Sequence, residues 1–378
     1  MKSAEDPRYF PQLTGVRAMA AFMVYLFHFN PFASKFFPPF VNSFFHEFHI
    51  GVNLFFVLSG FLICYRYYDS YLFNRKWFYG FTVRRVARIY PVYLLITTVT
   101  FIAFYFQNKF EFNSLIAQYI LNITFLRGFF EGLHFSGVVQ GWSLTVEECF
   151  YFSAPLIFLF SKRMKLYVQP IMLLLTGIIL VLIFRQIPFH GFFGSMRFML
   201  GYTFFGRCIE FYCGIYLALH YKKRQNNSIE NKNSNSLYTI LGMGSIILCM
   251  SVFAWVGEFS FASGNIKEVG LLINDLFMPF GIALFFWGLL TEHSLIRRVL
   301  STPIFDLLGK SSYVFYLIHM GVIQQLVVHT IPGSALIKKA LAFVVLNILS
   351  ILIYKLIESP MNKWIKKTAL PKKQIEFS

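Results

Sequence analysis

The sequence predicts an all-α membrane protein, a polytopic helix bundle of about ten transmembrane helices with both termini in the cytoplasm. Of its 378 residues, 57% are hydrophobic, 20% are aromatic and only 13% are charged. A soluble chain usually carries about 25% charged residues, and one soluble core cannot bury 49 Phe against 17 acidic residues. This composition excludes a soluble enzyme, a disordered regulator and a secreted disulfide scaffold.

Ten apolar segments, each bounded by charged or turn residues, follow one another along the chain. Each is roughly 17–22 residues long, enough for a helix to cross a hydrocarbon core of about 30 Å. They are expected to be helices because lipid cannot satisfy exposed backbone polar groups. The expected spans are Leu13–Phe29, Gly51–Tyr67, Tyr90–Phe106, Gly141–Phe160, Leu166–Phe184, Met199–His220, Leu237–Val256, Val269–Leu290, Ser312–Ile331 and Ala340–Ile357.

The basic residues set the orientation of these spans. With ten helices, 25 of the 34 Lys and Arg residues fall on the side that holds both termini. The positive-inside rule therefore places both ends in the cytoplasm. Most of the net charge of +17 then reflects membrane topology, so no nucleic-acid partner is expected.

Residues 113–127 are apolar but mixed with Gln, Asn and Thr, and they predict an interfacial or re-entrant helix on the outer side. An eleventh span here would invert the C-terminal half and remove the bias of the basic residues. We divide the chain into a membrane domain at 1–365 and a basic cytoplasmic tail at 366–378.

Arg17 and His28 are candidate functional residues of the first helix. They are eleven residues apart, which places both on one helix face about 16 Å apart. Histidine is the side chain best suited to exchange a proton near neutral pH. A structural histidine at the outer membrane interface is an equally good interpretation from this helix alone.

Glu147 and Glu148 lie near the start of the fourth span, at the depth expected for His28. A carboxylate beside a histidine fixes its tautomer and stabilises the imidazolium. Successive residues point about 100° apart, so one Glu is expected to face a shared site. Alternatively, one Glu caps the helix or neutralises an arginine such as Arg127.

Three arginines, Arg84, Arg85 and Arg88, precede the third span on the cytoplasmic side. Arg84 and Arg88 share a helix face and form a fork suited to phosphates, although ordinary positive-inside anchoring explains them as well. His319 lies within the ninth span, where a structural role competes with a chemical one.

A metal site has little support in the sequence. His46, Glu47 and His49 share one short outer loop, too few ligands for a firm metal prediction. The five cysteines lie in apolar stretches without a CxxC pair and are expected to be small buried side chains. The sequence predicts no bound metal.

Taken together, these motifs resemble acyltransferase family 3, integral membrane proteins that O-acylate cell-surface carbohydrates. The resemblance covers most of the chain and keeps the order of the family's motifs. They are R-x10-H from Arg17 to His28, Gly51–Leu62 with L-S-G-F, Arg84–Pro91, W-S-L-T-V-E-E-C-F-Y at Trp142–Tyr151, Arg207–Gly214, Leu308–His319 and E-S-P at Glu358–Pro360.

The resemblance implies a role for each candidate. It makes His28 the leading catalytic residue, with Glu147 and Arg17 beside it and Glu148 secondary. It implies that the three arginines bind an acyl-CoA donor, acetyl-CoA foremost, which is a co-substrate and not a permanent cofactor. Ser59 and Gly60 are expected to allow close helix packing. Substrate contacts are expected from Trp142, Tyr151, Glu148 and His319.

The implied function is membrane O-acetyl transfer from cytosolic acyl-CoA to a glycan hydroxyl at the outer face of a bacterial inner membrane. Two alternatives from another class remain: a carrier that moves a glycan or lipid-linked sugar without chemistry, and a proton-coupled transporter. The oligomeric state does not follow from the sequence.

Overall fold

The computed structural model describes residues 9–31, 37–187, 189–226, 236–256, 274 and 276–371. Every regular element within these residues is a helix, which confirms the all-α prediction. The chain forms two compact units, which we call the first and second unit. The first consists of Met1–Ser70 and Cys208–Ser312, and the second of Tyr71–Arg207 and Tyr313–Ser378.

The first unit is built mainly from the N-terminal helices and from a second group after α9. Its elements are α1 (Pro11–His28), α2 (Pro39–His46), η1 (Glu47–Ile50), α3 (Gly51–Tyr67), α10 (Leu237–Val256), α12 (Met278–Thr291) and α13 (Leu295–Leu300), with most of α9 (Phe204–Asn226) and of α14 (Pro303–Ile318). Helix α1 packs against α3 and α13.

Close packing of α3 on α9 depends on two glycines of the family motifs. A Cβ at Gly60 would collide with the backbone of Phe211, and a Cβ at Gly214 would collide with the backbone of Val57. The rings of Phe56 and Phe211 stack between the same helices, with centroids 4.8 Å apart. The packing role expected for the L-S-G-F motif is therefore confirmed at Gly60.

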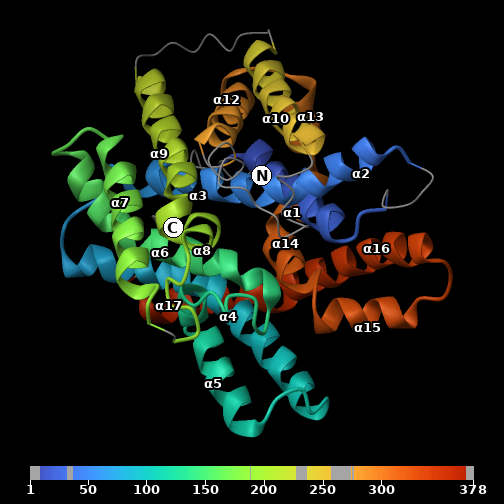
Figure 1. Cartoon of the computed structure of the whole chain (residues 1–378). Helices are drawn as coiled ribbons and strands as arrows, with labels where there is room; N and C mark the ends of the chain where they lie inside the picture. The colour runs from blue at the N-terminus through green and yellow to red at the C-terminus, as the bar shows by residue number, and fades with distance from the viewer. Residues whose placement is uncertain are drawn as a thin grey trace. The chain divides into compact units, whose positions relative to one another are not determined.

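Helices α10 and α12 lie side by side (Figure 1) and are joined by a buried carboxylate. Glu292, just after α12, accepts hydrogen bonds from the backbone N–H groups of Tyr238 and Thr239 at 2.7 and 2.9 Å. The first N–H groups of a helix have no acceptor within it, and its N-terminus favours negative charge. Glu292 therefore caps α10 from the neighbouring helix.

The second unit contains the longer helices. Its elements are α4 (Arg75–Phe106), α5 (Phe112–Ile123), η2 (Leu126–Phe129), η3 (Val139–Gly141), α6 (Trp142–Ser161), α7 (Val168–Phe184), α8 (Met196–Tyr202), α15 (Val322–Thr330), α16 (Ala335–Ile353), the π-helical turn η5 (Tyr354–Glu358) and α17 (Ser359–Ala369).

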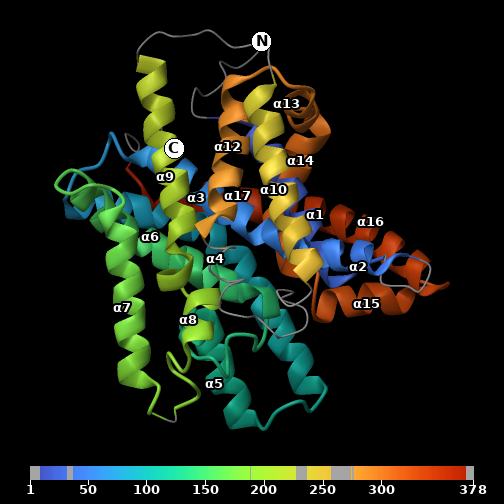
Figure 2. The same ribbon diagram turned by 45° about the horizontal axis from the view of Figure 1, so that its top comes forward.

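Helix α4 begins fifteen residues before the expected start at Tyr90 and carries the whole arginine motif in one regular helix. Asn74 starts it by accepting a hydrogen bond from the N–H of Trp77 at 2.8 Å. The stretch expected to be interfacial contains α5, which packs back along the C-terminal part of α4 (Figures 1 and 2). Its 12 residues span about 18 Å, too short to cross a bilayer.

Among the residues that the structure describes, five helices are long and apolar enough to cross a membrane: Pro39–Tyr67, Arg75–Phe106, Val139–Ser161, Leu237–Trp255 and Ala335–Ala369. A sixth crossing results if the bent pair α14 and α15 counts as one. The fold is thus a helical membrane architecture, while ten spans and cytoplasmic termini stay a prediction.

Two expected spans are not single continuous helices. Ser312–Ile331 is not one helix: α14 ends at Ile318 and α15 leaves it at 94°, because Gly321 adopts a left-handed backbone with φ of 87°. Met199–His220 is broken at Thr203, whose hydroxyl donates to the Met199 carbonyl at 2.7 Å and so takes part in ending α8.

One further expected span and the expected domain boundary compare with the structure as follows. The expected span Val269–Leu290 lies partly outside the described residues, and α12 covers its C-terminal part. The proposed domain boundary after residue 365 falls inside α17, and residues 372–378 of the tail lie outside the described residues.

Candidate functional site

In the second unit, the arginine motif of α4 meets the W-S-L-T-V-E motif of α6. The hydroxyl of Tyr151 donates to the carboxylate of Glu147, one turn earlier on the same face of α6. The guanidinium of Arg85 lies 5.5 Å from the centre of the Tyr151 ring, within cation–π range. These three side chains form a cation–aromatic–carboxylate contact, which we call the Arg85 cluster.

Glu148 takes part in the electrostatics of the same cluster. It interacts with Arg85 favourably and with Glu147 unfavourably. The side chains of Glu147 and Glu148 are both half-buried. Glu148 therefore adds a second carboxylate to the electrostatics of this part of α6.

Arg88 contacts a different acid. Its Nη1 atom lies 3.0 Å from Oε1 of Glu358, the last residue of the π-helical turn before α17. The Glu358 side chain is 1% exposed and that of Arg88 is 34% exposed. The ion pair connects E-S-P, the motif at Glu358–Pro360, to the arginine motif, and a π-helical turn is a frequent feature of functional sites.

We expect this ion pair to be measurably coupled. A double-mutant cycle compares the free energies of unfolding of the wild type, Arg88→Gln, Glu358→Gln and the double variant. The coupling energy from this cycle is expected to be about 1–2 kcal/mol. This value is below that of a fully buried pair because Arg88 is partly solvated. The Lys310–Asp306 pair of α14, in which both side chains are partly exposed, should give about 0.5 kcal/mol or less. Equal coupling in the two cycles would contradict a special role for Arg88.

His319 lies in a buried polar network at the end of α14. Its Nδ1 atom lies 2.7 Å from the Tyr316 carbonyl, and the hydroxyls of Tyr316 and Ser143 are 2.7 Å apart. Gln140 donates from Nε2 to the Leu317 carbonyl. These bonds join the W-S-L segment to the point where α14 ends, so His319 helps to shape this helix end, and contact with substrate stays a prediction.

Trp142 lies away from the Arg85 cluster. Its ring meets Tyr202 edge-on, with centroids 4.9 Å apart, and Tyr202 lies 4.7 Å from His134. Trp142 and Tyr151 are nine residues apart on α6, which turns them to opposite helix faces. Two of the residues expected to contact a sugar therefore lie in different environments. Trp142 packs beside Tyr202, and Tyr151 lies beside Arg85.

Arg127 is a buried residue whose environment the sequence did not reveal. Its guanidinium donates to the carbonyls of Ser136 and Val138, the latter at 2.6 Å. The suggestion that Glu147 or Glu148 neutralises it is wrong, since its hydrogen bonds in the described chain go to these carbonyls. Burial lowers the pKa of Arg127, and Tyr93 acts in the opposite direction.

Arg127 thereby organises the segment between α5 and α6. In this segment His134 bonds through Nδ1 to the Glu131 carbonyl at 2.6 Å. Burial lowers the pKa of His134, and that hydrogen bond partly offsets the effect. A single arginine among apolar residues and glycines, at Leu126–Phe129, is the signal that could have indicated a buried cation.

In the first unit, Arg17 and His28 lie on α1 as expected. The guanidinium of Arg17 lies 5.6 Å from the centre of the Phe55 ring on α3. His28 is the last residue of α1 and its side chain is exposed, with its ring 4.6 Å from that of Phe27. The pairing of His28 with Glu147 joins residues of different units and stays a prediction.

Near this end of α1 lies a buried carboxylate that the sequence treated as part of a loop. Glu47 is almost fully buried, and its Oε2 atom lies 3.8 Å from Nδ1 of His49. The Phe27 ring lies 5.8 Å from the ring of His49. Within the described residues no group of three His, Cys, Asp or Glu side chains is placed to hold a metal ion.

Comparison with known proteins agrees with these motifs. The family model described as an acyltransferase domain, of acyltransferase family 3, matches residues 10–361. Two proteins named O-acetyltransferase OatA, from Staphylococcus aureus strains MRSA252 and NCTC 8325, are each 25% identical over 392 aligned residues, 99% of this chain and 61% of theirs.

A further relative, from Staphylococcus aureus strain COL, is 23% identical over 94% of this chain and 58% of its own length. The chain thus spans about three fifths of the length of the curated relatives it matches. No solved structure is significantly similar.

Proposed function

Because this chain belongs to acyltransferase family 3, we propose that it is a membrane O-acetyltransferase. It would transfer an acetyl group from acetyl-CoA to a hydroxyl of a cell-surface or lipid-linked glycan. The name O-acetyltransferase of its relatives supports the reaction class. The observation that carries the proposal is the Arg85 cluster, in which the motif expected to bind the donor meets the motif expected to support acid–base chemistry.

In this proposal the donor binds at the inner face of a bacterial inner membrane. The ten-helix topology inferred from the basic residues, with both termini in the cytoplasm, would put the start of α4 on that side. Arg85 lies about 15 Å farther along this helix, beside α6. Arg84 and Arg85 then hold the phosphates of CoA through charge-assisted hydrogen bonds. Arg88 contributes less directly, because Glu358 already occupies it.

His28 is proposed to carry the chemistry at the glycan hydroxyl. As a general base, it takes the hydroxyl proton while the oxygen attacks the thioester carbonyl. The tetrahedral intermediate then expels the CoA thiolate, which receives that proton. As an acyl carrier, His28 is acetylated by the donor with loss of CoA thiol and then passes the acetyl group to the hydroxyl. Glu147 would orient the imidazole in either route.

The experiment that tests this function supplies labelled acetyl-CoA and glycan to membranes that contain the protein. Label is expected in the glycan, with one CoA thiol released per acetyl group transferred. A carrier that only moves glycan would translocate it without label, and a proton-coupled transporter would show transport that collapses with the proton gradient. Either result without acetyl transfer would contradict the proposal.

The donor assignment has its own test. Arg84→Gln with Arg85→Gln should raise the KM for acetyl-CoA at least about tenfold, since each charged hydrogen bond contributes about 1.5–3 kcal/mol. The KM for the glycan should change little. Arg163→Gln with Arg185→Gln removes two exposed arginines and should leave both constants unchanged. A selective rise in the glycan KM would reassign the arginines to the acceptor.

A further inference from the structure

A pocket of about 320 Å³ lies at the start of α4, apart from the Arg85 cluster. The segment before α4, the first turn of α4 and one proline of α6 form it. The lining residues that matter here are Tyr71, Phe73, Arg75, Trp77, Phe78 and Pro155. Arg85 lies ten residues beyond Arg75 on the same helix, about 15 Å along its axis.

Aromatic contacts hold the inner wall of the pocket in place. Trp77 stacks on Phe81 with centroids 5.2 Å apart, and Tyr71 meets the Trp77 ring edge-on at 5.0 Å. Tyr71 is only 5% exposed, and its hydroxyl has no hydrogen-bond partner among the described residues. A buried donor without an acceptor is costly and calls for an explanation, of which a bound group is one.

The electrostatics of the pocket favour an anion. Arg75 lines it, and the ammonium of Lys162 lies 5.5 Å from the centre of the Tyr71 ring. The first turn of α4 lies at the same place, where the helix dipole also favours negative charge. In this turn the N–H groups of Trp77 and Phe78 already donate to Asn74. None of the described residues that line the pocket is acidic.

The rim of the pocket is apolar and open. Leu72 is 62% exposed and Phe73 is 71% exposed, which is unfavourable in water but ordinary where side chains enter the interfacial region of a bilayer. An occupant with a hydrocarbon chain would cover this rim, whereas a water-soluble nucleotide would leave it exposed. The occupant therefore needs both a negative head and an apolar tail.

We propose that this pocket binds one anionic phospholipid from the surrounding leaflet. Arg75, Lys162 and the N-terminus of α4 receive its phosphate, and the first carbons of an acyl chain lie against Trp77 and Phe78. A zwitterionic lipid has the same tail, but its ammonium group faces the same two cations and weakens its binding.

Trp77 provides a direct probe of occupancy. The protein is placed in nanodiscs that contain a small fraction of phosphatidylglycerol with a dibrominated acyl chain, or of phosphatidylcholine with the same chain. The Trp77 signal is the fluorescence difference between the wild type and Trp77→Phe, since the chain has five Trp. We expect half-maximal quenching at a brominated phosphatidylglycerol fraction at least threefold lower than for phosphatidylcholine.

Two charge variants separate a built site from general surface charge. Arg75→Gln with Lys162→Gln should make the two lipids quench equally. Lys76→Gln with Lys165→Gln removes the same charge from the same two segments without touching a pocket residue, and should keep the preference. Variants are compared only where the protein elutes as the wild type does.

Three outcomes would overturn the proposal. The wild type could show no preference between the lipids, or both charge variants could lose the preference alike. Acetyl-CoA could also protect Trp77 from quenching in competition, which would assign the pocket to the nucleotide. The lipid result does not depend on acetyl transfer, so failure of the proposed enzyme function leaves this test intact.

Discussion

His28→Ala is expected to lower acetyl transfer by at least about 100-fold, because general acid–base groups typically contribute 10²–10⁴-fold to a rate. His28 is the exposed last residue of α1, so its removal leaves no cavity and little change in stability is expected. The measurement is the initial rate of labelled acetyl transfer at saturating donor, together with the thermal unfolding of each variant.

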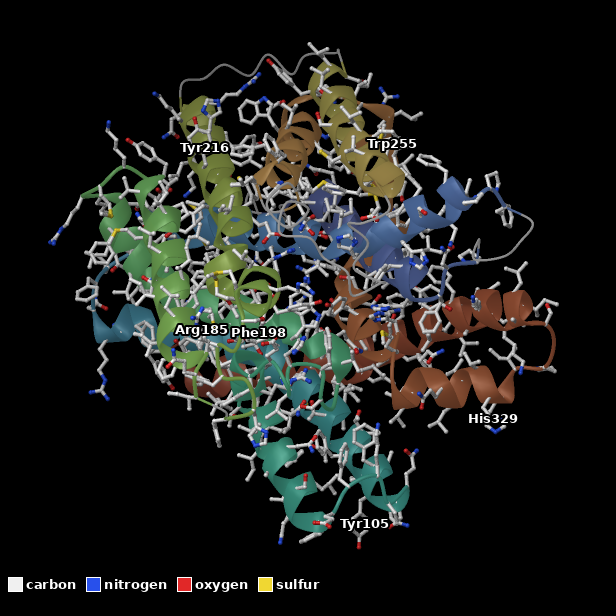
Figure 3. All side chains as sticks on the ribbon, in the orientation of Figure 1. Tyr105, Arg185, Phe198, Tyr216, Trp255 and His329 are labelled. Carbon is white, nitrogen blue, oxygen red and sulfur yellow. The ribbon has the colours of Figure 1, made fainter. Side chains whose placement is uncertain are left out.

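His329→Ala is the matched control for this substitution. His329 is also an exposed histidine near the end of a short helix, α15, and is labelled in Figure 3. Its removal should leave the rate within about twofold of the wild type, as expected of a surface change. Equal losses in the two variants, or a normal rate in His28→Ala, would show that His28 has no chemical role.

The same variant separates the two proposed routes. If His28 carries the acetyl group, the wild type mixed with acetyl-CoA and no glycan should release one equivalent of CoA thiol in a rapid burst, and His28→Ala should release none. If His28 is a general base, neither protein should show a burst. In that case CoA is released only after the glycan oxygen has attacked the acetyl carbonyl, so no thiol appears without glycan.

Arg127→Met is expected to destabilise the second unit by about 2–4 kcal/mol. Methionine keeps most of the side-chain volume but donates no hydrogen bond, so the buried Val138 carbonyl and the carbonyl of the half-buried Ser136 lose their partner. Each buried group left unsatisfied costs about 1–3 kcal/mol, and relief of the buried charge offsets part of that cost. Denaturant unfolding in detergent measures the difference.

Arg185→Met provides the control, because Arg185 is exposed at the C-terminal end of α7 and is labelled in Figure 3. It should change the stability by less than about 0.5 kcal/mol. A loss below about 1 kcal/mol in Arg127→Met would mean that the segment between α5 and α6 keeps its fold without the guanidinium.

Much of the candidate site could be predicted because its motifs depend on local helix geometry. The i,i+4 spacing of Glu147 and Tyr151 places them on one face of α6, where they bond. The small residue in L-S-G-F predicts a close helix crossing, and Gly60 meets the backbone of Phe211. Such inferences need only the helix period and the size of a side chain.

Other features could not be predicted because they pair residues far apart in the chain. The ion pair of Arg88 with Glu358 joins positions 270 residues apart, and Glu292 caps a helix that begins 55 residues earlier. A basic or acidic residue in an apolar sequence indicates that a partner is needed. It does not indicate which of many groups becomes that partner.

The sequence by itself determined the helical membrane character, the family and the main candidate residues, because composition, helix period and motif spacing are properties of short stretches of chain. The tertiary structure decided which motifs meet. Tyr151 contacts Arg85, and Arg127 donates hydrogen bonds to backbone carbonyls. Helices α14 and α15 meet at an angle of 94° near Gly321. The physical reason is that a buried polar group must find a hydrogen-bond partner. The packing of the helices determines which partner lies within reach.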